Sequence, residues 1–277
     1  ERLFRLAQCF AVELNGYAVM SNHFHLVVYF DPKAANAWSD EEIIERWFHA
    51  FPPSRHRVNK TKQLHNEKER MRNNPLRLAH CRNVLGSLSE FMKHLKQPIA
   101  WRINREDDQR GHCFEQRFYS GAILSDRALL TTLAYVDLNP VRARIADDIT
   151  QCQHTSVAKR LAELENTPER IDEYLAPLAS GLTPSLDENL PTTNDDAALH
   201  DRHHARRPKS TLRRYLELLR SLIAAERGTQ HRPNSETLLW AQDVAAMHKR
   251  QRAYGPEPAL RKWMEERQFR MVEEPMG

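Results

Sequence analysis

Two histidines in the stretch Tyr17–Phe30, YAVMSNHFHLVVYF, have the spacing of paired metal ligands. The stretch predicts two strands, at about 11–19 and 23–30, joined by a tight turn. His23 and His25 then share one strand face, because successive side chains of a strand point to opposite faces. Two neutral imidazoles side by side supply half of a divalent metal site. The same pattern is also typical of a polar strand face, so the spacing alone leaves both interpretations open.

A second pair of functional side chains lies on a helix that we expect at 126–138. Ser125 is a suitable N-cap, and the helix should end before Pro140, because the residue before a proline disfavours helical backbone. On a helical wheel the leucines form one stripe, whereas Tyr135 and Asn139 lie together on another face. A phenol there could attack a phosphodiester, and the amide oxygen could bind a hard metal ion. A surface tyrosine on a polar face is the other interpretation.

The two pairs together would form a metal site beside a nucleophile. His23, His25 and Asn139 would supply three ligands and leave positions open. Mg²⁺ or Mn²⁺ would then polarise a phosphate, and the nitrogen ligands favour Mn²⁺. Tyrosine has a pKa of about 10 and is a weak nucleophile, so Tyr135 would need such activation and positioning.

Several elements must position these residues. In the first half we expect a helix at 1–10, a helix capped by Ser39 and Glu42, a mobile basic insertion at 55–82 that is partly helical around 64–72, a helix at 84–104 and a third strand at 112–124. In the second half we expect short helices at 155–178, a linker at 180–210, an amphipathic basic helix at 212–226 and helical structure at 235–270.

Composition limits the class of protein. The 277 residues include 41 Lys and Arg and carry a net charge of +4, which permits a polyanionic partner. The 8 glycines form neither a GxGxxG nor a Walker-type loop. The four cysteines, none in a CxxC pair, indicate reduced thiols. No apolar run reaches the roughly 18 residues of a membrane span, so we expect a cytoplasmic protein without a membrane partner.

Three motifs in this order, MSNHFHLVV, GHCFEQRF and LAYVDLNPVRA, resemble those of the REP-associated tyrosine transposases, a branch of the HUH single-tyrosine transposases. The resemblance covers 1–150, with a helical and basic insertion at about 38–83. It implies a ferredoxin-like α/β (α+β) domain, in which an antiparallel sheet has helices on one face. We expect 151–210 to hold short helices and a linker, and 211–277 to form a basic, largely helical extension. The family's first strand normally precedes the helix that begins here at Glu1, so we expect that strand to be missing.

This resemblance also implies a function. It predicts a metal-dependent single-stranded DNA endonuclease and strand transferase that acts on hairpin-forming repeat DNA, as a monomer or a homodimer. Carried over by motif, Tyr135 forms a 5′-phosphotyrosine link, while His23, His25 and Asn139 bind Mg²⁺ or Mn²⁺. The alternative is a catalytically impaired DNA-binding protein derived from such a transposase. A histidine-triad hydrolase would need a third histidine where Val27 stands.

Cations and aromatic residues near the motifs are candidates for further DNA contacts. Aromatic rings can stack on unpaired bases, and arginines after the tyrosine helix would lie where phosphates pass. Each arginine could instead be a solvated surface charge. The candidates are Arg117, Phe118, Tyr119, Arg142, Arg144, Lys93 and Arg102.

Overall fold

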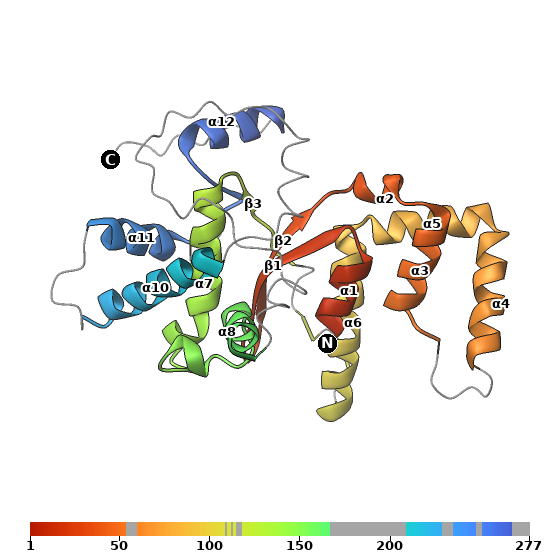
Figure 1. The fold of residues 1–277 in the computed structure, drawn as a ribbon, viewed down its shortest axis with the longest axis horizontal. Coiled ribbons are helices and arrows are strands. Elements are labelled where there is room, and N and C mark those ends of the chain that lie inside the picture. The colour runs from red at the N-terminus through yellow and green to blue at the C-terminus, as the bar shows by residue number, and fades with distance from the viewer. Residues whose placement is uncertain are drawn as a thin grey trace. The chain divides into compact units, whose positions relative to one another are not determined.

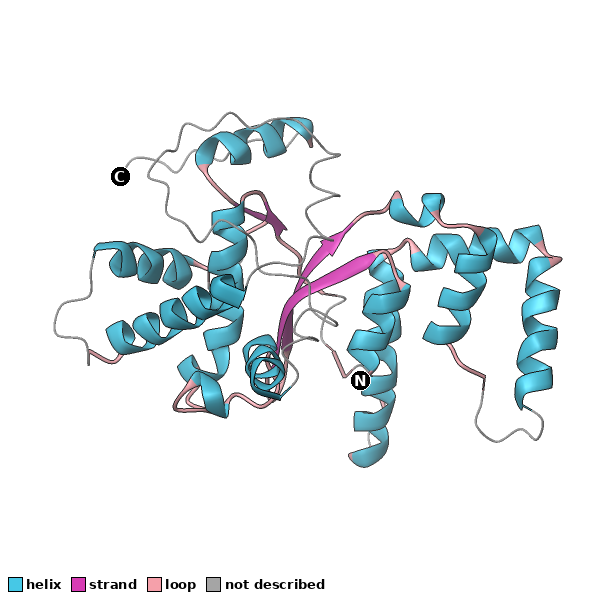
Figure 2. Cartoon of the chain, in the orientation of Figure 1, coloured by secondary structure: helices cyan, strands magenta, loops and turns pink. Residues whose placement is uncertain are grey.

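The computed structural model of the protein describes residues 1–53, 60–108, 110–111, 113–114, 118–166, 209–228, 235–247 and 251–267. These residues form a mixed α/β structure that is mostly helical and contains a small antiparallel sheet of two strands (Figure 2). The chain divides into two compact units, one made of residues 1–14 and 28–119 and the other of residues 15–27 and 120–277. None of the described helices has the length and apolar character needed to cross a membrane.

The two histidines lie on a β-hairpin, which confirms the prediction from the sequence. Its strands are β1 (Val12–Val19) and β2 (Phe24–Phe30). The backbone N–H of Met20 donates to the carbonyl of His23 at 2.9 Å and closes a loop at Ser21 and Asn22. His23 directly precedes β2, and His25 lies within it. Both histidines therefore belong to the second unit, because the division of the chain falls inside each strand.

Helices make up most of the first unit (Figure 1). They are α1 (Arg2–Cys9), α2 (Ala34–Ala37), α3 (Asp40–Ala50), α4 (Lys60–Arg72), α5 (Pro75–Leu85) and α6 (Leu88–Glu106). The predicted capping box is present, since Ser39 accepts from the N–H of Glu42 at 3.2 Å and Glu42 accepts in return from Ser39. The core of this unit includes Leu6, Ile43, Ile44, Met71, Cys81, Leu85 and Phe91, all fully buried.

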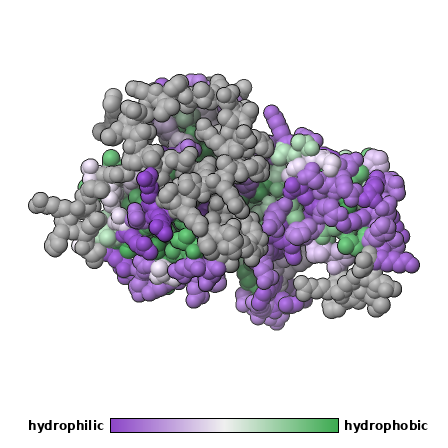
Figure 3. Space-filling model, viewed as in Figure 1, coloured by the Kyte–Doolittle hydropathy of each residue, from purple (hydrophilic) through white to green (hydrophobic). Residues whose placement is uncertain are grey.

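The basic insertion expected at 55–82 is helical around 64–72 as predicted, within α4, but it is more regular than a mobile segment, since its described residues also form most of α5. Met71, Leu78 and Cys81 are buried, whereas Leu76 is exposed. Two cations bind acidic residues of α3: Arg72 pairs with Glu41 at 2.7 Å, and Lys68 pairs with Glu45. The unit is therefore apolar inside and mainly hydrophilic over α4 and α5 in the view of Figure 3. The rest of the predicted insertion, residues 55–59, lies outside the described residues.

The single helix expected at 84–104 is divided in two at Gly86 and Ser87. Ser87 caps α6 by accepting from the N–H of Glu90 at 3.3 Å. Gly86 lies in close packing, because a Cβ atom there would lie 3.0 Å from the Cβ of Ala35. Contacts with a neighbouring helix thus end α5 where the apolar periodicity of the sequence runs on.

The helix that carries the tyrosine is α7 (Asp126–Arg142), which begins after Ser125 as predicted. It continues past Pro140, where we expected it to end. A proline inside a helix removes one backbone donor, but here its ring is buried. Its carbonyl also accepts from the N–H of Ile145 at 2.8 Å in the turn that follows. Asn139 therefore lies within the helix, one full turn after Tyr135.

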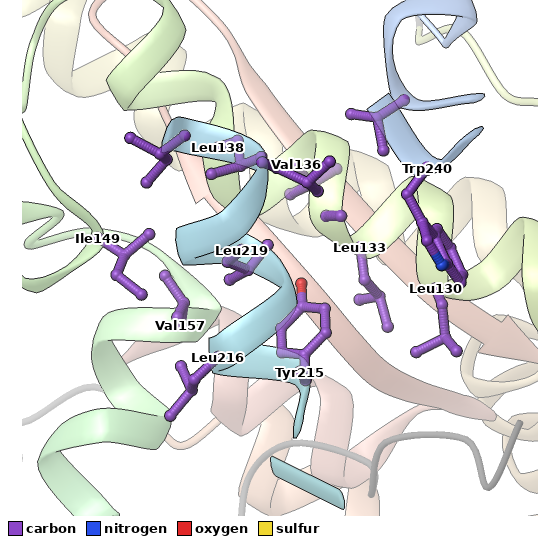
Figure 4. Close-up of a cluster of buried hydrophobic side chains, with 14 of the residues drawn as sticks. Leu130, Leu133, Val136, Leu138, Ile149, Val157, Tyr215, Leu216, Leu219 and Trp240 are labelled. Atoms are coloured by element: carbon purple, nitrogen blue, oxygen red, sulfur yellow. The ribbon is translucent and has the colours of Figure 1, made fainter. Parts of the chain in front are cut away.

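Elements from distant parts of the chain surround α7 in the second unit (Figure 1). They are the 3-10 helix η1 (Ile149–Gln151), α8 (Ser156–Asn166), α10 (Lys209–Glu226) and α11 (Ser235–Ala246). A buried cluster joins them, with Leu130, Leu133 and Val136 of α7 facing Leu216 and Leu219 of α10 (Figure 4). The extension that we expected to be basic therefore also contributes core residues to the unit that holds the tyrosine.

The centre of this packing is a buried carboxylate on α7. Asp137 is fully buried, and its Oδ1 accepts from Ser156 Oγ at 2.5 Å and from the backbone N–H of Val157 at 3.0 Å. Its Oδ2 accepts from Tyr215 Oη of α10 at 2.7 Å. Ser156 Oγ accepts in turn from the N–H of Tyr17 in β1 at 3.0 Å. These bonds tie α7 to the hairpin, to α8 and to α10.

Two predictions for the second unit need correction. The third strand expected at 112–124 is reduced to β3 (Ala122–Ile123) among the described residues. It pairs in parallel with β4 (Ala253–Tyr254), and Gly121 permits the approach because a Cβ there would lie 2.8 Å from Gln251 O. The helical region expected at 235–270 is accordingly interrupted by β4, which separates α11 from α12 (Glu257–Glu266).

Most of the predicted linker at 180–210, and the later part of the short helices expected at 155–178, lie outside the described residues.

We predict that Tyr215→Phe lowers the free energy of unfolding by about 1–3 kcal/mol, because it removes one donor from a buried carboxylate. Urea unfolding followed by tryptophan fluorescence measures the loss. Tyr119→Phe is the matched control, since that ring is 47% exposed. Equal effects of the two substitutions would show that the hydrogen bond from Tyr215 to Asp137 does not stabilise the fold.

Candidate functional site

The two imidazoles of the hairpin converge on one another. His23 Nε2 and His25 Nε2 are 3.1 Å apart, and the rings meet edge to face. His23 Nδ1 is 2.6 Å from Asn22 Oδ1. Burial, followed by the neighbouring His23, lowers the pKa of His25 to about 4. His25 is therefore neutral at pH 7, and one of its ring nitrogens keeps a lone pair that could bind a metal ion.

The spacing of these two nitrogens fits a shared metal ion. Metal–nitrogen bonds of about 2.1 Å that meet at roughly 90° place two nitrogens about 3.0 Å apart. The separation of 3.1 Å also fits a hydrogen bond in which one Nε2 donates to the other. The separation is thus compatible with a shared metal ion and also with a hydrogen bond between the two rings.

Tyr135 lies against His25, which is half-buried. The rings of His25 and Tyr135 are perpendicular, with centroids 5.8 Å apart. Tyr135 is half-buried, and its ring packs against the apolar cluster of the second unit. The expectation of a face away from the leucines is therefore only partly correct, because α7 is covered on most sides. The hairpin and α7 bring a phenol and two imidazoles to one place.

Asn139 lies one turn beyond Tyr135 on the same helix. Its Nδ2 donates to the backbone carbonyl of Tyr135 at 3.1 Å. This bond fixes the amide plane and leaves Oδ1, the atom that could bind a metal, on the other end of the amide. Among the described residues, no group of three or more His, Cys, Asp and Glu side chains could hold a metal ion. The predicted third ligand, Asn139, is an amide and does not belong to these four residue types.

Arg142 places a positive charge at the tyrosine. Its guanidinium carbon is 5.9 Å from the centroid of the Tyr135 ring. Its Nε donates to Glu226 Oε1, at the end of α10, at 3.0 Å. Glu226 thus holds Arg142 at the ring, so the C-terminal extension contributes to the surroundings of the predicted nucleophile.

The other predicted DNA contacts have varied positions. Arg144 is exposed, with a positive φ of 56°, just after α7. Lys93 and Arg102 lie on α6 in the first unit, where they pair with Glu90 at 3.0 Å and Glu106 at 2.8 Å. Phe118 and Tyr119 also belong to the first unit, and Arg117 lies outside the described residues.

Sequence reasoning missed three residues that shape this site: Asn22, Asp137 and Glu226. A signal existed for the first two, since Asn22 is next to the His-x-His pair and Asp137 interrupts an otherwise apolar face of α7. Glu226 carried no signal, because its partner Arg142 is 84 residues away in the chain.

Comparisons of the chain with models of protein families, with curated proteins and with solved structures find no match. The geometry of the site therefore carries the functional argument.

We predict that His25 makes the fold less stable in acid. Its folded pKa of about 4 lies below the usual value of 6.5 for histidine, so between these values only the unfolded chain binds the proton. Its contribution is complete above about pH 6.5 and is lost as the pH falls toward 4, by about 3 kcal/mol at most.

Urea unfolding with chelator present, at pH 7 and at pH 4, tests this effect. His25→Gln should lose less stability between the two pH values than the parent does. His154→Gln, at an exposed position, is the control and should behave as the parent. If His25→Gln and the parent lose the same amount, His25 is not held neutral by burial.

Proposed function

We propose that the protein is a metal-dependent single-stranded DNA endonuclease and strand transferase that uses Tyr135 as its nucleophile. The observation that carries the proposal is that Tyr135 lies next to the pair formed by His23 and His25. The ring centroids of Tyr135 and His25 are 5.8 Å apart. This arrangement places a possible nucleophile beside two possible metal ligands. It suits the transfer of a phosphoryl group, in which a ligand pair and a nucleophile must act on one phosphate.

The metal of this proposal is Mg²⁺ or Mn²⁺, held by His23, His25 and Asn139. Bound there, it would polarise the scissile phosphate and lower the barrier to attack. His25 suits this role because its low pKa of about 4 removes competition from a proton at neutral pH. The two Nε2 atoms already lie at the separation of neighbouring ligands.

The chain's own residues would carry the reaction. Tyr135 Oη forms a bond to phosphorus as the bond from phosphorus to the 3′ oxygen breaks. The phenol loses its proton, and the 3′ oxygen gains one, which leaves a 5′-phosphotyrosine and a free 3′-OH. Arg142 supplies positive charge at the ring, where the phosphate would approach. The reverse reaction joins strands, so no ATP is consumed.

The proposal extends to the partner and the fold. The substrate would be hairpin-forming repeat DNA with a single-stranded segment, cut by a monomer or a homodimer in the cytoplasm. We propose that the β1–β2 hairpin belongs to a ferredoxin-like sheet that has helices on one face. Its support is the order of these elements, with a helix before the hairpin and the tyrosine helix after it.

The second candidate is a protein that binds the same DNA without cutting it. One observation favours it: the described residues include only a two-stranded sheet and a two-residue parallel pair. Such a protein would bind hairpin DNA but form no covalent adduct, so adduct formation separates the two candidates.

We predict that Tyr135→Phe abolishes the covalent adduct, because no oxygen remains to attack phosphorus. A 3′-labelled hairpin with single-stranded flanks is incubated with the full chain and Mn²⁺. A denaturing gel then shows label that migrates with the protein. Tyr254→Phe is the matched control in the same unit and should keep the adduct. An adduct in Tyr135→Phe would reject this nucleophile, and no adduct with the parent would favour the binding protein.

We predict that Arg142→Gln weakens DNA binding and makes it less dependent on salt, because one phosphate contact is lost. The slope of the logarithm of affinity against the logarithm of salt should fall in magnitude by about 0.7 for a single strand. Fluorescence anisotropy over a salt series measures it. Arg127→Gln is the matched control. Arg127 lies at the opposite end of α7 from Arg142 and is likewise paired with a carboxylate, that of Asp243. An unchanged slope in Arg142→Gln would show that Arg142 does not meet the DNA.

A further inference from the structure

The loop of the hairpin contains a hydrogen bond that decides which nitrogen of His23 carries the proton. Asn22 Oδ1 is 2.6 Å from His23 Nδ1. An amide oxygen only accepts hydrogen bonds, so Nδ1 must be the donor. The neutral ring then has its lone pair on Nε2, the atom that faces His25.

The backbone of the loop offers no other reason for an asparagine at this position. Asparagine is common in tight turns because it tolerates a positive φ. Among the described non-glycine residues, however, only Asp108 and Arg144 have a positive φ. Asn22 and His23 are both exposed, and the contacts that the structure shows for the His23 ring are those with Asn22 and His25. The Asn22 side chain is therefore the restraint at Nδ1, whereas His25 lies at Nε2.

We propose that Asn22 is a positioning residue that holds His23 in the Nδ1–H form and presents its Nε2 lone pair for a divalent metal. The metal part of this inference rests on the proposed function. A hydrogen bond to the distal nitrogen is the usual way in which a protein orients a histidine ligand and raises its basicity.

The same geometry makes the two histidines unequal. Because His23 Nε2 accepts, the 3.1 Å contact requires His25 Nε2 to donate in the metal-free protein. His25 must therefore move its proton from Nε2 to Nδ1 before its Nε2 can bind a metal, whereas His23 needs no change. Asn22 prepares one ligand in advance, and the second ligand adjusts when the metal arrives.

The first test reads the tautomers directly in the full chain. Long-range ¹H–¹⁵N NMR spectra of ¹⁵N-histidine protein are recorded with chelator at neutral pH, and His23→Gln and His25→Gln assign the signals. The parent should show Nδ1–H at His23 and Nε2–H at His25. Asn22→Ala should lose the Nδ1–H form of His23, whereas Asn22→Asp, which keeps an acceptor, should retain it. Ser21→Ala, in the same loop, is the control and should match the parent.

The second test measures Mn²⁺ affinity by calorimetry, without DNA or turnover. Asn22→Ala should bind about 10–100-fold more weakly than the parent, while Asn22→Asp and Ser21→Ala should stay close to it. Circular dichroism and thermal unfolding verify that each variant folds. On metal binding to the parent, only His25 should change its tautomer.

The outcomes separate this inference from the proposed function. If Asn22→Ala keeps the parent tautomer, or binds Mn²⁺ as tightly as the parent, the positioning role of Asn22 is wrong even if the site binds metal. If the parent binds Mn²⁺ no better than His23→Gln does, the proposed metal site fails, and the metal part of the inference fails with it. The NMR comparison still decides whether Asn22 sets the tautomer.

Discussion

The second unit depends on one buried carboxylate. Asp137 lies two residues after the predicted nucleophile and receives hydrogen bonds from Ser156, Val157 and Tyr215, which belong to two other helices. Burial raises the pKa of Asp137, while Arg160 and these donors act in the opposite direction. A buried carboxylate that lost a donor would be costly, so the elements that supply the donors must stay together. The position of α7 is fixed by this requirement.

The hydrogen bonds of Asp137 also position the elements that carry the site. The hairpin joins this hydrogen-bond network through the N–H of Tyr17, and Gly16 lets α7 come close, since a Cβ there would lie 2.5 Å from Leu133 Cδ2. Packing of the hairpin against α7 brings His25 to the ring of Tyr135. The helix α10, which is far from both in the sequence, adds Tyr215 to the network and Glu226 to Arg142. The extension therefore supports the predicted catalytic helix in addition to any contact with DNA.

Charge is arranged unequally around Tyr135. Burial keeps His25 neutral, and Arg142 is the cation at the ring, held there by a carboxylate of α10. A phosphate that approached the ring would meet this guanidinium and would compete with Glu226 for it. In the proposed function, Asn22 selects which nitrogen of His23 is presented to the metal ion. Each of these effects depends on a contact between two side chains. The type of a single residue therefore does not predict it.

The sequence by itself determined the local features: the hairpin with His23 and His25, the capping box at Ser39, and the start of α7 after Ser125. These follow from alternation, capping chemistry and periodicity, which act over a few residues. Only the tertiary structure decided that α7 continues through Pro140, that the region expected to be a third strand forms a short parallel pair with β4, and that α10 supplies core residues to the second unit. Burial outweighs the local preference at Pro140. The other two features depend on partners far away in the chain, since β3 pairs Ala122 with Ala253 and Tyr215 of α10 bonds Asp137 across 78 residues.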